Sequence, residues 1–200
     1  KNETKQLTYD ALDRLTSITL NGTKRFNYSY DPLSRRLKTI THIFDGSSWN
    51  KADSKLYYYD SSQDIGFCNE EKEIKELCIL GLNFNQEQTP IAIEIEGNPF
   101  LALYDEVLSL RSLVSLKDKT LAQSYRYTSF GERLIYNEDG VEELPLTAIG
   151  FQGKRHDSES GFIFYGRRYY YPKIKRWIHL DPSGFQDGSN RYLLDRKSVV

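Results

Sequence analysis

The sequence predicts an all-β protein made mainly of antiparallel hairpins, and two observations carry this prediction. Segments such as 15–20 (LTSITL) and 24–30 (KRFNYSY) alternate bulky and polar residues, which is the pattern of half-buried strands. A motif also repeats, since YDALDRL begins at Tyr9 and YDPLSRR begins at Tyr30. A period of about 20 residues is typical of stacked units that pack on their neighbours.

Turn residues divide the middle of the chain into further strands. Asn21-Gly22 predicts a tight hairpin turn, and the segments 61–64 (SSQD), 117–119 (KDK) and 130–131 (FG) mark others. The strands expected between them include 55–60 (KLYYYD), 65–68 (IGFC), 74–81 (IKELCILG) and 90–100 (PIAIEIEGNPF), the last broken at Gly97, Asn98 and Pro99. The charged run 69–77 could begin a short helix, but its β-branched neighbours favour a charged hairpin.

Residues 161–171 (GFIFYGRRYYY) predict a strand with rings on both faces. Alternation assigns Phe162, Phe164, Arg168 and Tyr170 to one face and Ile163, Tyr165, Arg167, Tyr169 and Tyr171 to the other. A strand of this kind is normally covered on both sides. The acidic link 137–150 that precedes it is the domain boundary that the sequence suggests.

The charge balance excludes a general affinity for polyanions. The chain carries 27 basic and 28 acidic residues, so it has no overall electrostatic reason to bind nucleic acid or an anionic membrane. The segment 166–177 (GRRYYYPKIKRW) does mix basic and aromatic residues, as a surface for single-stranded nucleic acid would. We favour a buried face instead, with Arg168 facing inward and Lys173 and Lys175 on a solvated turn. No apolar run is long enough to span a bilayer, and no signal sequence opens the segment.

The sulfur and imidazole side chains do not predict a metal site. Cys68 and Cys78 are too far apart for a CxxC pair and have no histidine nearby. Two buried or free thiols are the simplest interpretation, and a disulfide stays open if this region is exported. Because His42, His156 and His179 are scattered, we expect no metal and no cofactor.

The acidic residues of the repeat have a structural interpretation. Asp10 and Asp31 are expected to fix turns with their side chains rather than to bind a metal. Methionine is absent and the chain starts inside a repeating pattern, so we expect a segment of a longer protein.

Several segments resemble the RHS/YD-repeat family and its RHS-repeat-associated core domain. They are the two YD units, YDEVLSLRSLV from Tyr104, YRYTSFGE from Tyr125, GFQGKRHDSESGFIFYGRRYYYPKIKRWIHLDPSG from Gly150, and the Gly-Ser-Asn-x-Tyr that ends at Tyr192. The segment from Gly150 is the most specific, because family members carry a Tyr-rich strand, an Arg before a Tyr pair, a Tyr-x-Pro turn and Asp-Pro-x-Gly in this order. The segment from Tyr104 lacks the glycine usual in its turn.

The resemblance covers most of the chain and implies three parts. These are YD/RHS repeats over 1–60, further RHS-type strands and hairpins over 61–149, and the incomplete C-terminal part of the core domain over 150–200. In the family, the strip of sheet spirals into a hollow shell that encloses a variable, usually toxic, C-terminal polypeptide. The core domain often releases this polypeptide by intramolecular aspartyl-type cleavage just after Asp-Pro-x-Gly.

The family's first catalytic aspartate matches Asp181, and the arginine that accompanies it matches Arg168. A buried arginine needs a carboxylate, and its planar group could hold Asp181 while stacking on Tyr170 or Phe164. Aspartyl-type hydrolysis needs a second carboxylate. The chain reaches Val200 before the family's second aspartate, and Asp195 stands in a different context. We therefore expect self-cleavage to be lost or incomplete in this chain, and at most a single-turnover reaction.

We expect a structural segment of an RHS-repeat protein of the polymorphic-toxin type. Its partner would be the C-terminal toxin or cargo polypeptide of the same chain, and the resemblance implies a secreted or cell-envelope location. One alternative is a surface-binding module that contacts glycans or a partner protein through its tyrosines, although packing within the sheets explains these rings more simply. Another alternative is a vestigial fragment.

Overall fold

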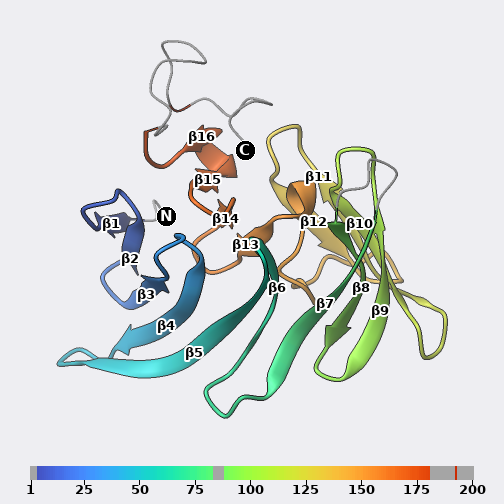
Figure 1. Ribbon diagram of the computed structural model, residues 1–200, viewed down its shortest axis with the longest axis horizontal. Helices are drawn as coiled ribbons and strands as arrows, with labels where there is room; N and C mark the ends of the chain where they lie inside the picture. The colour runs from blue at the N-terminus through green and yellow to red at the C-terminus, as the bar shows by residue number, and fades with distance from the viewer. Residues whose placement is uncertain (1–3, 83–87, 181–191, 193–200) are drawn as a thin grey trace. The chain divides into compact units, whose positions relative to one another are not determined.

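The computed structural model describes residues 4–82, 88–180 and 192, and these residues form antiparallel strands with two short 3-10 helices (Figure 1). The predicted all-β class is therefore confirmed. The chain divides into two compact units, Lys1–Lys75 and Glu76–Val200. We describe each unit by itself.

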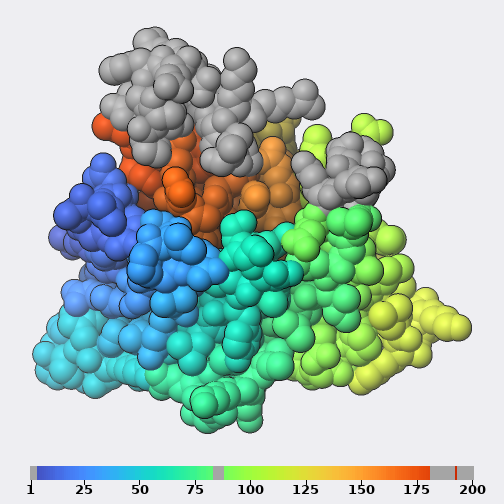
Figure 2. All heavy atoms as spheres, in the orientation of Figure 1, coloured from blue at the N-terminus to red at the C-terminus, as the bar shows by residue number. Residues whose placement is uncertain are grey.

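The first unit contains six strands, each paired antiparallel with the next along the chain. They are β1 (Lys5–Tyr9), β2 (Leu15–Leu20), β3 (Lys24–Tyr30), β4 (Arg36–Phe44), β5 (Trp49–Asp60) and β6 (Gln63–Cys68). Alternation holds from Ile18 onward as predicted, because Ile18, Leu20, Phe26 and Tyr28 are buried while the residues between them along the strands are more exposed. In Figure 2 the side chains of β4 and β5, coloured blue to cyan, form a closely packed surface.

The predicted turn between β2 and β3 is confirmed. Asn21 and Gly22 have φ angles of 48° and 69°, and the N–H of Thr23 donates to the carbonyl of Leu20 at 3.0 Å. Asn and Gly adopt positive φ at lower cost than other residues, which is why they predict this turn.

The second unit contains a six-stranded run of hairpins and a separate four-stranded sheet. The run is β7 (Ile74–Leu82), β8 (Gln88–Ile95), β9 (Asn98–Tyr104), β10 (Leu110–Ser115), β11 (Leu121–Tyr127) and β12 (Arg133–Tyr136), again paired in sequence order. Its inner face carries Cys78, Ile93, Leu113, Tyr125 and Ile135, which are all buried.

The hairpin of β8 and β9 differs from the prediction. Residues 97–99 were expected to break the strands, yet Glu96 and Gly97 alone form the turn, with φ angles of 48° and 77°, and Pro99 lies inside β9. Pro90 also lies inside β8, next to a register shift. Proline is tolerated near strand starts and at bulges because the missing N–H is not needed there.

The charged run after β6 forms a turn and then the start of β7, not a helix. Cys68 and Cys78 are both buried and neither forms a disulfide, which confirms the simpler interpretation of the two thiols.

The four-stranded sheet consists of β13 (Arg155–Asp157), β14 (Phe162–Phe164), β15 (Tyr169–Tyr171) and β16 (Arg176–Trp177), paired in this order. The 3-10 helices η1 (Phe151–Gly153) and η2 (Pro172–Ile174) precede β13 and β16. Residues 161–171 therefore form two strands, and the predicted single alternation is wrong. The turn between them, with Gly166 at a φ of 87°, resets the alternation. Tyr170 consequently pairs with Ile163 rather than lying on the face of Phe162 and Phe164.

Both faces of this small sheet are covered, as predicted. Ile163 and Tyr170 pack with Phe151 and Trp177 in one buried cluster. On the other side the ring of Phe164 lies 5.0 Å from that of Tyr169, and the ring of Phe162 lies 4.9 Å from that of Tyr171. The aromatic residues thus build the interior of the sheet.

Candidate functional site

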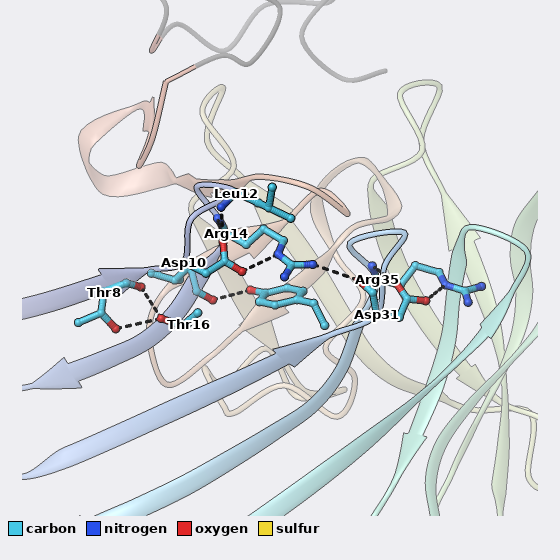
Figure 3. Close-up of polar contacts among 9 residues, drawn as sticks. Thr8, Asp10, Leu12, Arg14, Thr16, Asp31 and Arg35 are labelled. Atoms are coloured by element: carbon cyan, nitrogen blue, oxygen red, sulfur yellow. Dashed lines mark hydrogen bonds and ion pairs between the residues drawn. The ribbon is translucent and has the colours of Figure 1, made fainter.

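The YD motif forms a five-residue turn closed by its aspartate (Figure 3). Asp10 Oδ1 accepts the N–H groups of Leu12 and Arg14 at 2.9 and 3.0 Å, and Asp10 Oδ2 binds Arg14 Nε at 2.7 Å. Asp31 repeats this arrangement with Arg35, at 2.8 Å to the main-chain N–H and 2.6 Å to Nε. The prediction that both aspartates fix turns is confirmed.

Each motif arginine also connects its own turn to the next one. Arg14 Nη1 donates to the main-chain oxygen of Asp31 at 3.0 Å, and its guanidinium lies 5.2 Å from the ring of Tyr30 (Figure 3). The Tyr30 hydroxyl in turn donates to the carbonyl of Leu15 at 2.6 Å. Tyrosine, aspartate and arginine of the motif thus have complementary roles in one inter-turn link.

The link recurs one unit further along. Arg35 Nη1 donates to the carbonyl of Ser61 at 2.6 Å, its guanidinium lies 5.4 Å from the ring of Tyr59, and the Tyr59 hydroxyl donates to the carbonyl of Arg36 at 3.1 Å. Tyr59, which is also followed by an aspartate, therefore takes in this link the place that Tyr30 has in the first.

The electrostatics of these turns suit structure rather than acid–base chemistry. Burial raises the pKa of Asp10 and of Asp31, but hydrogen bonds from Arg14 and Arg35 outweigh it and hold each pKa below its usual value. Both carboxylates consequently stay ionised and bonded at neutral pH, and neither is poised to exchange a proton.

The same turn occurs at four further places, and the sequence analysis identified a turn at two of them, after Tyr104 and at Phe130-Gly131, without its closing side chain. Its first residue accepts from the N–H four positions later through a side-chain oxygen at Asn69, Asp105, Thr128 and Asn137. Its fourth residue has a positive φ, from 62° to 84°, at Lys72, Leu108, Gly131 and Gly140. The glycine absent from the Tyr104 segment is therefore replaced by Leu108 in the same conformation. An Asp, Asn or Thr followed three positions later by glycine would have predicted this turn from the sequence. Only two of the four turns have that glycine, because Lys72 and Leu108 occupy the position in the other two.

Arg168, the predicted partner of Asp181, is buried with 5% of its surface exposed. Its guanidinium lies 4.1 Å from the ring of Trp177, the residue that pairs with Tyr170 in the sheet. Its Nη2 donates to the carbonyl of His179 at 3.4 Å. Asp181 itself lies outside the described residues, as does Asp195.

The other basic residues of this segment face solvent. Arg167, Lys173, Lys175 and Arg176 are exposed, which agrees with the predicted solvated turn. The N–H of Trp177 donates to the carbonyl of Tyr192 at 3.0 Å. Arg168 and Tyr192 thus both contact Trp177.

A second buried polar cluster, which the sequence did not reveal, lies on the inner face of β7, β11 and β12. Glu76 binds Arg155 at 2.7 Å, and both side chains are 3% exposed. Burial alone would raise the pKa of Glu76, but Arg155, the Thr147 hydroxyl and the Ala148 N–H outweigh it and hold that pKa below its usual value. Gln123 is fully buried beside this cluster.

The histidines are not grouped for catalysis or metal binding. His156 Nε2 accepts the N–H of Phe151 at 3.0 Å, and burial followed by the charge of Arg133 keeps its pKa well below 6.5. In the part of the chain that the structure describes, no group of three or more His, Cys, Asp or Glu is placed to hold a metal ion. Across the same residues, no helix has the length and apolar character to cross a membrane.

These observations define the class as an antiparallel sheet segment whose repeats are joined by Asp–Arg–Tyr links. Residues 9–47 match the RHS Repeat family, which is the region that contains the first two of these turns. Residues 9–47 are therefore identified as RHS repeats.

Relatives are found among toxin proteins. The chain is 27% identical over 107 residues to "Toxin subunit YenC1" of Yersinia entomophaga, covering 54% of this chain and 11% of that protein. It is 21% identical to "Double-stranded DNA deaminase toxin A" of Burkholderia cenocepacia, covering 96% of this chain and 14% of that protein. It is 26% identical to "tRNA3(Ser)-specific nuclease WapA" of Bacillus spizizenii, covering 92% of this chain and 7% of that protein. The chain thus spans a small fraction of each relative.

Solved structures share its fold. The crystal structure of TcdB2-TccC3 matches with a TM-score of 0.66 and 19% identity, covering 97% of this chain and 10% of that one. The Photorhabdus luminescens Tc holotoxin pore matches with a TM-score of 0.68 and 21% identity, covering 98% and 10%. The chain therefore shares the fold of these structures, and its sequence is similar to that of toxin proteins.

Proposed function

We propose that this chain is a structural part of a secreted or cell-envelope RHS-repeat toxin-type protein, in which its sheet forms part of a shell. The shell would enclose or present a variable C-terminal toxin or cargo polypeptide of the same protein. The observation that carries this proposal is the repeated inter-turn link, because each arginine fastens one turn to the next through a main-chain oxygen. Similarity to toxin components supports it.

Protease protection of the parent protein, expressed with its native flanking sequence, tests enclosure. The C-terminal polypeptide should resist trypsin far longer in the parent than when it is expressed alone. Replacing both link arginines, Arg14→Leu with Arg35→Leu, should shorten this protection because the hairpins lose their connections.

A matched control is available in the same turns. Leu12 and Leu33 are 69% and 67% exposed, so Leu12→Ala with Leu33→Ala should leave the protection unchanged. Equal cleavage of the polypeptide inside the parent and alone would refute enclosure and favour a vestigial or surface-binding segment.

A second candidate function, intramolecular cleavage after Asp181, is favoured by the position of Arg168. Its buried guanidinium bonds the main chain of His179, two residues before Asp181 in the sequence, and in this proposal it would orient that aspartate and balance its charge. The reaction would need a second carboxylate, which the adjoining sequence of the parent would have to supply. Our primary proposal is that cleavage is lost or incomplete in this chain.

The intact mass of the parent protein separates these two candidates. Two fragments in the parent and one uncut mass in Asp181→Asn would establish cleavage, and Arg168→Gln should then also stay uncut while the exposed control Arg167→Gln is cut. One uncut mass in every sample would leave Arg168 with a structural role beside Trp177.

A further inference from the structure

Residues 144–149 are held in an unusual way. They follow β12 but do not pair with it as a strand, and apart from an isolated bridge at Ile149 they belong to neither sheet. Their main-chain groups are bonded instead by side chains from β7, β11 and β12. These strands include the first and the last of the six-stranded run, so the segment spans the inner face of that sheet.

Gln123 on β11 uses both ends of its amide on this segment. Its Nε2 donates to the carbonyl of Leu144 at 2.7 Å, and its Oε1 accepts the N–H of Leu146 at 2.9 Å. The Tyr125 hydroxyl donates to the same Oε1 at 2.5 Å and fixes the orientation of the amide. A side-chain amide that bonds one carbonyl and one N–H of a peptide imitates the edge of a neighbouring strand.

Charged groups bind the second half of the segment. Glu76 Oε2 accepts the N–H of Ala148 at 3.0 Å and the hydroxyl of Thr147 at 2.7 Å. Arg133 Nη1 lies 3.2 Å from the carbonyl of Thr147 and 3.4 Å from that of Ile149. Hydrogen bonds to ionised groups are stronger than neutral ones, and burial strengthens them further.

Most of these hydrogen bonds go to main-chain groups of the segment rather than to its side chains. Leu144 and Leu146 are 86% and 43% exposed, whereas Gln123 and Glu76 on the sheet are 0% and 2% exposed. Thr147 and Ile149 of the segment are buried, and the Thr147 hydroxyl donates to Glu76. A buried polar surface that bonds the backbone of such a segment has the properties of a site for extended polypeptide.

We propose that the inner face formed by Glu76, Gln123 and Arg133 is a binding site for extended polypeptide main chain, and that residues 144–149 are its tethered ligand. Occupation of the site positions the four-stranded sheet, because Arg155 at the start of β13 completes the site by pairing with Glu76. This site is distinct from Arg168 and does not depend on cleavage or on a cargo.

Cleavage of the chain between β12 and residues 144–149 tests whether the sheet binds this segment when the two are no longer joined there. Residues 138–141 form an exposed turn, so a protease recognition sequence inserted there can be cleaved in the folded protein. The two fragments of the nicked protein should stay together on gel filtration at micromolar concentration. Immediate separation of the nicked wild-type protein would overturn the proposal.

Variants of the site should weaken this association specifically. Glu76→Gln and Gln123→Leu should each raise the dissociation constant of the nicked complex at least about tenfold, since each leaves a buried partner unsatisfied. Glu106→Gln makes the same chemical change at an exposed position and should leave the constant unchanged. Equal constants for all three variants would contradict the proposal.

A change on the ligand side covers the case in which a sheet variant does not fold. Thr147→Val keeps the shape of the side chain and removes only the hydroxyl bonded to Glu76, and it should raise the dissociation constant several-fold. In the uncut protein, hydrogen exchange at the amides of Leu146 and Ala148 should accelerate in this variant while Ile93 and Leu113 stay protected. Unchanged exchange at both amides, together with an unchanged constant, would refute a specific site.

Discussion

At the scale of single residues, two buried tyrosines of the second unit differ in whether their hydroxyl groups form a hydrogen bond. The Tyr125 hydroxyl donates to Gln123, whereas the buried hydroxyl of Tyr104 has no hydrogen-bond partner among the described residues. Burial raises the pKa of both phenols, so both are neutral at physiological pH and differ only in their bonding.

This difference predicts unequal costs for the same mutation. Tyr125→Phe should lower the free energy of unfolding by about 1 kcal/mol, because it removes a bond and leaves Gln123 partly unsatisfied. Tyr104→Phe should change it by less than about 0.5 kcal/mol, because no bond is lost. Urea unfolding followed by circular dichroism measures both, and equal costs would contradict this assignment.

Turn positions with positive φ predict another pair of opposite effects. Lys72 is exposed and has a φ of 64°, so Lys72→Gly should raise the free energy of unfolding by about 0.5 to 1 kcal/mol. Gly140 has a φ of 78° and open space around it, so Gly140→Ala should lower it by about 1 kcal/mol through the backbone alone. Thermal unfolding of both variants measures the effects, and a stabilising Gly140→Ala would disprove the explanation.

The sequence predicted some of these residues and not others for physical reasons. Asp10 and Asp31 were predictable because an aspartate in a turn bonds nearby N–H groups wherever the chain is placed. The burial of Arg168 was predictable from its aromatic neighbours, but its stacking on Trp177 depends on a turn that the alternation did not reveal. Gln123 lies in phase with Tyr125 and Tyr127, so its inward direction was readable, but its partners come from a distant segment.

At the scale of elements, the inter-turn links determine how each hairpin holds the next. Arg35→Leu should accelerate hydrogen exchange several-fold at residues 60–63, because that turn loses its bond from Arg35 while the turn at Asp10 keeps its own arginine. The neighbouring change Leu33→Ala should have no such effect, since this side chain is exposed. Exchange that rises equally in both turns, or in neither, would show that the arginine does not connect them.

Strands were predicted well where alternation and turn residues agree, as in β2 and β3. They were predicted poorly in 161–171, because aromatic residues fill both faces and hide the turn at Gly166. Hydrophobic periodicity cannot locate a turn within a segment that is buried on both sides.

At the scale of the whole molecule, stability should depend on pH through His156. The folded state holds its pKa below 6.5, so the unfolded chain binds the extra proton as the pH falls through this value. The contribution of His156 to stability is therefore fully present above about pH 6.5. Below that pH the free energy of unfolding should fall by up to about 1.4 kcal/mol for each pH unit, until the pKa of His156 in the folded state is reached.

The pH dependence can be assigned to His156 by considering its neighbours and by mutation. Arg133 opposes its protonation, and the ring of Tyr127 packs against it. His156→Gln retains an acceptor for Phe151 and should remove most of the slope of melting temperature between pH 7 and 5, whereas His42→Gln should retain it. The pKa of Glu76 is held low, so its pair with Arg155 should weaken only at more acidic pH. An unchanged slope in His156→Gln would reject the assignment.

A cryo-electron microscopy map of the parent protein with its native flanks tests most directly the proposed role of this chain in a toxin-type shell. The C-terminal polypeptide should lie inside a wall to which this sheet contributes, with the arginine links intact. A map in which that polypeptide lies outside the wall and is fully exposed to solvent would contradict the account.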